Sequence, residues 1–125
     1  MPPLAGLRRR ADFLAAARAR RAGTPGFLLQ ARRREAGEAI PDTARMGFTC
    51  SRKVGNAVAR NRAKRRLRAI AREVLPEAGH PGWDYVLIGR PGAKAERPYP
   101  LLLEDLRNAL SRVHAPAGNK SPRPA

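Results

Sequence analysis

The stretch VARNRAKRRLRAIAR, from Val58 to Arg72, holds six arginines, one lysine and no acidic residue. At about 100° per residue, its small and apolar side chains fall on one stripe, which predicts an amphipathic helix packed on a sheet. The stripe consists of Ala59, Ala63, Leu67, Ile70 and Val74. Asn56 is a favoured N-cap residue, so we expect the helix to begin there and to run to about Leu75, before Pro76.

The polar side of this helix carries one sign of charge. Asn61, Lys64, Arg65, Arg68 and Arg72 follow i, i+3, i+4, i+7, i+11 spacing and share a face, flanked by Arg60, Arg62 and Arg66. Like charges at this spacing destabilise a helix by a few tenths of a kcal/mol per pair unless an anion neutralises them. A solvated surface helix is the alternative. The charge favours nucleic acid, because guanidinium groups suit bidentate phosphate contacts and an amide can add a base or sugar contact.

The whole chain has the same excess of basic over acidic residues. Its 125 residues contain 26 Lys and Arg against 10 Asp and Glu, for a net charge of +16. Abundant arginine, alanine, glycine and proline can reflect the base composition of a genome, but clustered arginine needs a partner. The length suits one domain with a modest core. A polyanion, and nucleic acid first of all, is the expected partner.

Composition also indicates the limits of the domain and its compartment. We expect disordered ends over residues 1–7 and 114–125, which are rich in Pro, Gly and small residues, and one domain over residues 8–113. No segment approaches the roughly 18 apolar residues that a membrane span needs. The single cysteine, Cys50, leaves no internal disulfide or cysteine zinc cluster and is expected in the core. A reducing cytoplasm fits this pattern.

Five further elements surround the basic helix. The patterns predict helices over about 12–21, capped by Asp12, and over 98–113, and strands over 26–33, 45–52 and 83–90. The last strand is nearly all apolar and is expected to be buried on both faces. Alternation in the first two strands predicts one face made of Phe27, Leu29, Ala31, Met46, Phe48 and Cys50, and an opposite face made of Leu28, Gln30, Arg32, Gly47, Thr49 and Ser51.

The sequence does not suggest a protein active site. A protein endonuclease needs clustered carboxylates for metal ions or a histidine acid-base pair. The ten acids are dispersed, and His80 and His114 are expected at the surface, in a Pro/Gly loop and at the end of a helix. We therefore predict no catalytic residue and no metal ligand in the protein.

The segment SRKVGNAVARNRAKRRLRAIAREV, Ser51 to Val74, resembles the signature of the bacterial ribonuclease P protein subunit. In that family an R-N-R core lies on a helix entered through a G-x-A-V turn. The strands before and after the helix, the terminal helix and the ADF helix follow in the family's order. The resemblance covers roughly residues 8–113.

This resemblance implies an α+β fold, a two-layer αβ sandwich in α-β-β-β-α-β-α order, like the second domain of a small-subunit ribosomal protein. It also implies a left-handed βαβ crossover, where general physics predicts the right-handed connection of about 98% of such units. The implied function is that of the accessory protein subunit of ribonuclease P, an endoribonuclease and hydrolase of the cytoplasm. The protein would bind the catalytic RNA and the 5′ leader of precursor tRNA, with no protein partner required, while Mg²⁺ is bound mainly by the RNA subunit and substrate.

Two sets of site residues follow from the same resemblance. The residues that would contact the RNA subunit are Arg52, Lys53, Arg60, Asn61, Arg62, Lys64, Arg65, Arg68 and Arg72. Those that would line the leader cleft are Phe13, Ala17, Leu28, Gln30, Thr49 and Ser51. Many relatives have aromatic residues where this chain has Ala17 and Gln30, and each stacked base contributes about 1 to 3 kcal/mol. Leader binding here is therefore expected to depend more on charge, and Phe13 is equally well explained as a core residue.

Two other functions remain open at this point. A structural RNA-binding protein of the ribosome would need the basic helix but no leader cleft. A DNA-compacting protein would need little sequence detail and a dimer interface, for which the sequence shows no exposed apolar patch.

Overall fold

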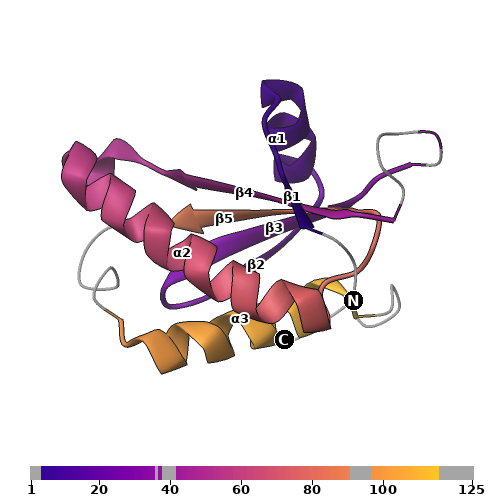
Figure 1. The fold of residues 1–125 in the computed structure, drawn as a ribbon. Helices are drawn as coiled ribbons and strands as arrows, with labels where there is room; N and C mark the ends of the chain where they lie inside the picture. Colours follow the sequence, from indigo (N-terminus) through magenta and orange to yellow (C-terminus); the bar gives the residue numbers. More distant parts are fainter. Residues whose placement is uncertain (1–3, 36, 38–41, 91–96, 116–125) are drawn as a thin grey trace.

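The computed structural model describes residues 4–35, 37, 42–90 and 97–115. Five strands form one mixed sheet in the order β1-β4-β5-β3-β2. Helix α1 lies on one face, and α2 and α3 lie on the other (Figure 1). The elements are β1 (Leu4–Gly6), α1 (Arg10–Ala17), β2 (Arg20–Gly23), β3 (Phe27–Arg33), β4 (Ala44–Cys50), the 3₁₀ helix η1 (Arg52–Val54), α2 (Ala57–Ala78), β5 (Trp83–Gly89) and α3 (Tyr99–Val113). From α1 onward this order confirms the predicted α+β fold.

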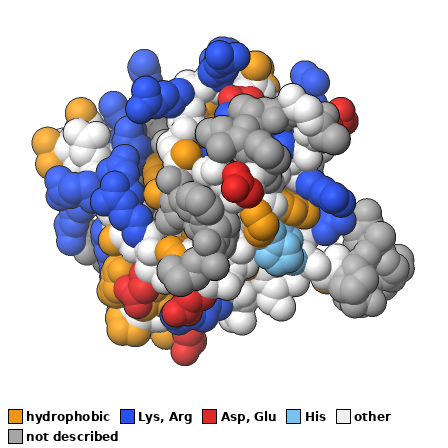
Figure 2. Space-filling model, turned by 45° about the vertical axis from the view of Figure 1, so that its right-hand side comes forward, with side chains coloured by type: hydrophobic (Ala, Val, Ile, Leu, Met, Phe, Trp, Pro, Cys, Tyr) orange, Lys and Arg blue, Asp and Glu red, His pale blue; other side chains and the backbone are white. Residues whose placement is uncertain are grey.

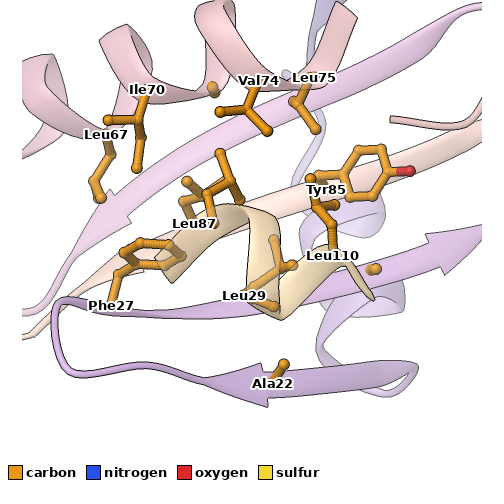
Figure 3. Packing of buried hydrophobic residues seen from close by; sticks show 14 of the residues in the cluster. Ala22, Phe27, Leu29, Leu67, Ile70, Val74, Leu75, Tyr85, Leu87 and Leu110 are labelled. Atoms are coloured by element: carbon orange, nitrogen blue, oxygen red, sulfur yellow. The ribbon is translucent and has the colours of Figure 1, made fainter. Parts of the chain in front are cut away.

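The main core lies between the sheet and the pair α2 and α3. Strand β5 is central, parallel to β4 and antiparallel to β3. Its side chains are buried on both faces, as its apolar sequence predicted, because Tyr85 and Leu87 lie in the main core and Val86 lies in the cluster under α1. Phe27, Leu29 and Leu87 point from the sheet toward the helices and are fully buried (Figure 3). Leu67 and Ile70 pack against them from α2. The predicted strand alternation is confirmed, and so is the helix stripe over Leu67, Ile70 and Val74, whereas Ala59 and Ala63 are half-buried.

Helix α2 begins as expected and ends later than expected. The Asn56 side chain accepts a hydrogen bond from the backbone N–H of Ala59 at 2.9 Å, which is an N-cap. The helix continues through Pro76 to Ala78. Pro76 has no backbone N–H, so the last turn of the helix lacks one hydrogen bond. The burial of Leu75 and the bond from Gly79 N to Leu75 O hold that turn.

The N-terminal segment differs from expectation. Residues Leu4–Gly6 form β1, which pairs in parallel with β4, and Leu7 after it is buried. The expected disorder of residues 1–7 is therefore wrong for residues 4–7. The outer edge of β4 offers backbone hydrogen bonds that a short strand accepts whatever its side chains. Residues 1–3 and 116–125 lie outside the described part of the chain.

The first helix is shorter than its pattern suggested. Helix α1 ends at Ala17, and Arg20–Gly23 form β2, antiparallel to β3. Asp12 does not cap the helix, because the N-cap position is Arg9 and it makes no side-chain cap bond. Asp12 instead forms an ion pair with Arg45 of β4, at 3.4 Å. This pair ties α1 to the sheet.

Candidate nucleic-acid interface

Two arginines on the basic face of α2 are positioned by contacts of their guanidinium groups. Asn61, Arg62, Arg65 and Arg72 are exposed, whereas Arg60, Lys64 and Arg68 are half-buried. The Arg60 guanidinium donates to the carbonyl of Gly55 at 2.7 Å, and that of Arg68 lies 5.2 Å from the Phe48 ring centroid. Basic side chains gather on the left of Figure 2, where the N-terminal half of α2 lies in Figure 1. The predicted RNA-binding residues of α2 thus form one surface.

The loop between β4 and α2 extends this basic surface. Arg52 and Lys53 are exposed in η1. The Ser51 hydroxyl accepts a hydrogen bond from the backbone N–H of Lys53 at 3.2 Å. Ser51 therefore caps η1 and is not among the residues that line the groove described next.

An open groove of about 500 Å³ lies between α1 and the sheet. Four of the predicted cleft residues, Phe13, Ala17, Gln30 and Thr49, line it together. Leu28 faces the same side of the sheet but does not line the groove. The full lining is Arg8, Arg10, Phe13, Leu14, Ala17, Gln30, Phe48, Thr49, Val86 and Ile88.

The sequence pattern missed the other six of these ten lining residues. Arg10, Phe13, Leu14 and Ala17 stand at i, i+3, i+4, i+7 spacing, so one helical face contributes all four. That spacing could have identified Arg10 and Leu14 once Phe13 was chosen. Val86 and Ile88 belong to a strand that is apolar on both faces, so no sequence signal separated them from the core.

Phe13 both packs and lines the groove. Its side chain is half-buried against the small cluster of Leu7, Ala16 and Val86. The ring lies directly over Gly47, where an added Cβ would stand 2.6 Å from two ring carbons. Glycine at position 47 therefore sets how closely α1 approaches the sheet, and with it the width of the groove.

Other polar groups on the molecule serve the fold. Asp84 is fully buried and bonded to Arg34 and Arg45, and Asp105 pairs with Arg97 at 2.7 Å. Burial raises the pKa of the half-buried Cys50 thiol, which disfavours the thiolate. Within the described residues, no group of three or more His, Cys, Asp or Glu side chains is placed to hold a metal ion. No described helix is long and apolar enough to cross a membrane.

Comparisons with known proteins agree with this geometry. The family model for ribonuclease P matches residues 1–114. The ribonuclease P protein component of Ruegeria pomeroyi is 66% identical over 110 residues, covering 88% of this chain and 86% of that protein. The component from Paramagnetospirillum magneticum is 51% identical over 110 residues, or 87% and 82% of the two chains. The solved ribonuclease P protein of Thermotoga maritima has a TM-score of 0.67 and 30% identity, covering 85% of this chain and 94% of that one.

A basic helix on one side of a mixed sheet and a groove on the other define a small RNA-binding α+β protein. The chain belongs to the ribonuclease P protein family, whose known role is the processing of tRNA 5′ ends. Membership implies association with ribonuclease P RNA in an endoribonuclease complex.

Proposed function

We propose that this chain binds the catalytic RNA of ribonuclease P through α2 and η1, and receives the 5′ leader of precursor tRNA in the α1 groove. The observation that carries the second part is the composition of the groove. It offers two exposed arginines, Arg8 and Arg10, an aromatic ring at Phe13 and an amide at Gln30. These are the groups that bind phosphates and stack on or hydrogen-bond to single-stranded bases.

The two surfaces are joined through β4. Thr49 lines the groove, and the chain passes from it through Arg52 and Lys53 into α2. An RNA bound along α2 and a leader in the groove would therefore meet at the end of β4. This arrangement supports a role in which the protein holds substrate and catalytic RNA together.

We assign cleavage to the RNA subunit, with Mg²⁺ bound mainly by that RNA and by the substrate. The buried carboxylates Asp84 and Asp105 support this assignment, because both are engaged by arginines and neither offers a general base. The protein's own contribution is to lower repulsion between phosphates as the two RNAs approach. This proposal needs no protein partner and places the complex in the cytoplasm.

The experiment is cleavage of precursor tRNA at low Mg²⁺ by the cognate ribonuclease P RNA, with and without this protein. The proposal predicts strong stimulation, lost when the leader is trimmed to one nucleotide. Stimulation that ignores leader length would reject the groove assignment while keeping the RNA partner. No stimulation would favour a structural RNA-binding protein of the ribosome.

A further inference from the structure

A second pocket, on the opposite face of the sheet from the α1 groove, combines aromatic rings with arginines. It has a volume of about 450 Å³, within the range of about 300 to 1,000 Å³ typical of small-molecule sites. We call it the histidine-tryptophan pocket. It is lined by Arg20, Arg33, His80, Pro81, Trp83, His114 and Ala115.

Four separate segments of the chain build this pocket. Trp83 begins β5 and is paired with Arg33 at the end of β3, and Arg20 begins β2. His80 follows α2, and His114 follows α3. Figure 2 shows a histidine side chain at the surface beside hydrophobic and basic groups. Helix α2 rises about 1.5 Å per residue, so the pocket lies roughly 25 Å from Arg62.

The rings of the pocket are held in fixed positions. The His80 and His114 rings stack at 3.6 Å between centroids with planes 10° apart, and Trp83 meets His114 edge to face at 4.4 Å. The Tyr85 hydroxyl accepts from the backbone N–H of His80 at 2.8 Å and lies 2.7 Å from Nε2 of His114. Burial, His80 and Arg20 lower the pKa of His114 to about 4, so the ring is neutral near neutral pH and shares a hydrogen bond with the Tyr85 hydroxyl.

One face of the His80 ring and the side chain of Arg33 are turned toward solvent. His80 is exposed. The His114 ring stacks on one face of the His80 ring, so the other face of the His80 ring is open. Arg33 is exposed at the rim. Arg20 lies 5.7 Å from the Trp83 centroid and donates to the carbonyl of Val113, which anchors the end of α3. The described residues that line the pocket include no acid.

We propose that the histidine-tryptophan pocket binds one nucleotide of single-stranded RNA, with the base stacked on the open face of His80 and the phosphate at Arg33. An acidic peptide would satisfy the arginine but would leave the rings without a partner. A nucleotide offers both a flat π surface and an anion, and stacking tolerates any base. The net charge of +16 adds attraction for RNA over the whole surface. The inference rests on the proposed function in one respect only, namely the identity of the RNA that supplies the nucleotide.

Trp83 is the only tryptophan in the chain, so its fluorescence reports on this pocket alone. The probe is a five-nucleotide oligoadenylate titrated into the full-length protein without ribonuclease P RNA. We expect saturable quenching, with an apparent Kd about tenfold weaker in His80→Ala and several-fold weaker in Arg33→Ala. The matched control Arg107→Ala, an exposed arginine on α3, should leave the quenching unchanged. Equal thermal unfolding of the variants checks that the pocket is intact.

Three results would overturn the proposal. The first is no quenching at oligonucleotide concentrations that saturate binding by fluorescence anisotropy. The second is quenching that neither His80→Ala nor Arg33→Ala weakens. The third is equal quenching by polyglutamate, which would identify an acidic protein segment as the occupant. None of these depends on precursor tRNA cleavage, so the proposed function is tested separately.

Discussion

Arg45 holds Asp84 through both carboxylate oxygens, with Nε and Nη2 each 2.8 Å from an oxygen. The two residues are register partners on β4 and β5, and Arg45 also reaches Asp12 of α1. Arg34 donates to the same carboxylate and to the carbonyl of Thr43. The hydrogen bond to Asp84 raises the pKa of Arg45. One buried acid on β5 thus joins α1, β4, the residue that follows β3 and the segment before β4.

Replacing Asp84 by Asn should destabilise the fold strongly. Removing one member of a buried ion pair leaves the other charge without compensation and costs about 3 to 5 kcal/mol. Urea unfolding followed by circular dichroism measures the change. Glu104→Gln, at an exposed acid on α3, is the control and should change stability by less than about 0.5 kcal/mol. Equal stability of the two variants would show that the Asp84 network contributes nothing.

Replacing Gly47 by Ala should push α1 away from the sheet. The new Cβ would stand 2.6 Å from the Phe13 ring and 3.2 Å from the Leu7 Cβ. Overpacking of this kind costs about 1 to 3 kcal/mol. Gly6→Ala is the matched control, since a Cβ there meets nothing within 4 Å. Thermal unfolding checks the prediction, which fails if Gly47→Ala is as stable as Gly6→Ala.

Removing one exposed arginine from α2 should change the salt dependence of RNA binding. Arg65→Ala deletes about one phosphate contact, so the slope of log K against log salt should fall by about 1. Arg107→Ala removes the same charge from α3 and should leave the slope unchanged. Filter binding to ribonuclease P RNA at salt concentrations from roughly 50 to 400 mM measures both slopes. Identical slopes for the two variants would argue against α2 as the RNA-binding face.

The stability of the fold should depend on pH through His114. Its pKa is about 4 in the folded protein against a usual value of 6.5, because burial first, and then the charges of His80 and Arg20, disfavour the cation. The unfolded chain therefore binds more protons between these values, and the free energy of unfolding falls as pH is lowered from about 6.5 to 4. His114→Gln should flatten this part of the profile.

His80→Gln serves as the control for the pH measurement. His80 is exposed, so its replacement should leave most of the slope in place. Carboxylates titrate in the lower part of the same range, and they do so equally in both variants. The assignment to His114 would be wrong if the two variants showed the same dependence on pH in urea unfolding.

Patterns among neighbouring residues predicted the elements that are specified by neighbouring residues. The capping residue and apolar stripe of α2 and the continuous apolar run of β5 are readable from a few neighbouring residues. Local patterns missed β1 and β2 because each is short and is held by hydrogen bonds to another strand, and only the resemblance implied a third strand before α2. Helix α2 runs past Pro76 because tertiary burial of Leu75 outweighs a helix breaker in the last turn.

The same distinction applies to the sites. The placement of the basic residues on one face of α2 was predictable because a helix places its residues by periodicity alone. The groove was predicted in part, since Ala17 and Gln30 came from the resemblance while Leu14 and Ile88 did not. His80 and His114 were expected as separate surface residues, but they stack on each other, and His114 is half-buried. Contacts between the ends of α2 and α3 cannot be read from either segment alone.

The central claim is that the α1 groove binds the leader, and a charge placed in it tests this most directly. Leu14 lines the groove and is 47% exposed, so Leu14→Glu adds a negative charge with little cost to folding. Leu101→Glu is the matched control, at a leucine on α3 that is 38% exposed. A like charge about 4 Å from a phosphate costs about 1 kcal/mol in water, so the expected effect is several-fold.

The measurement is the affinity of the reconstituted ribonuclease P complex for precursor tRNA and for mature tRNA. Leu14→Glu should weaken binding of the precursor several-fold and leave mature tRNA unchanged, while Leu101→Glu changes neither. Equal weakening for both RNAs, or no weakening for the precursor, would contradict the account.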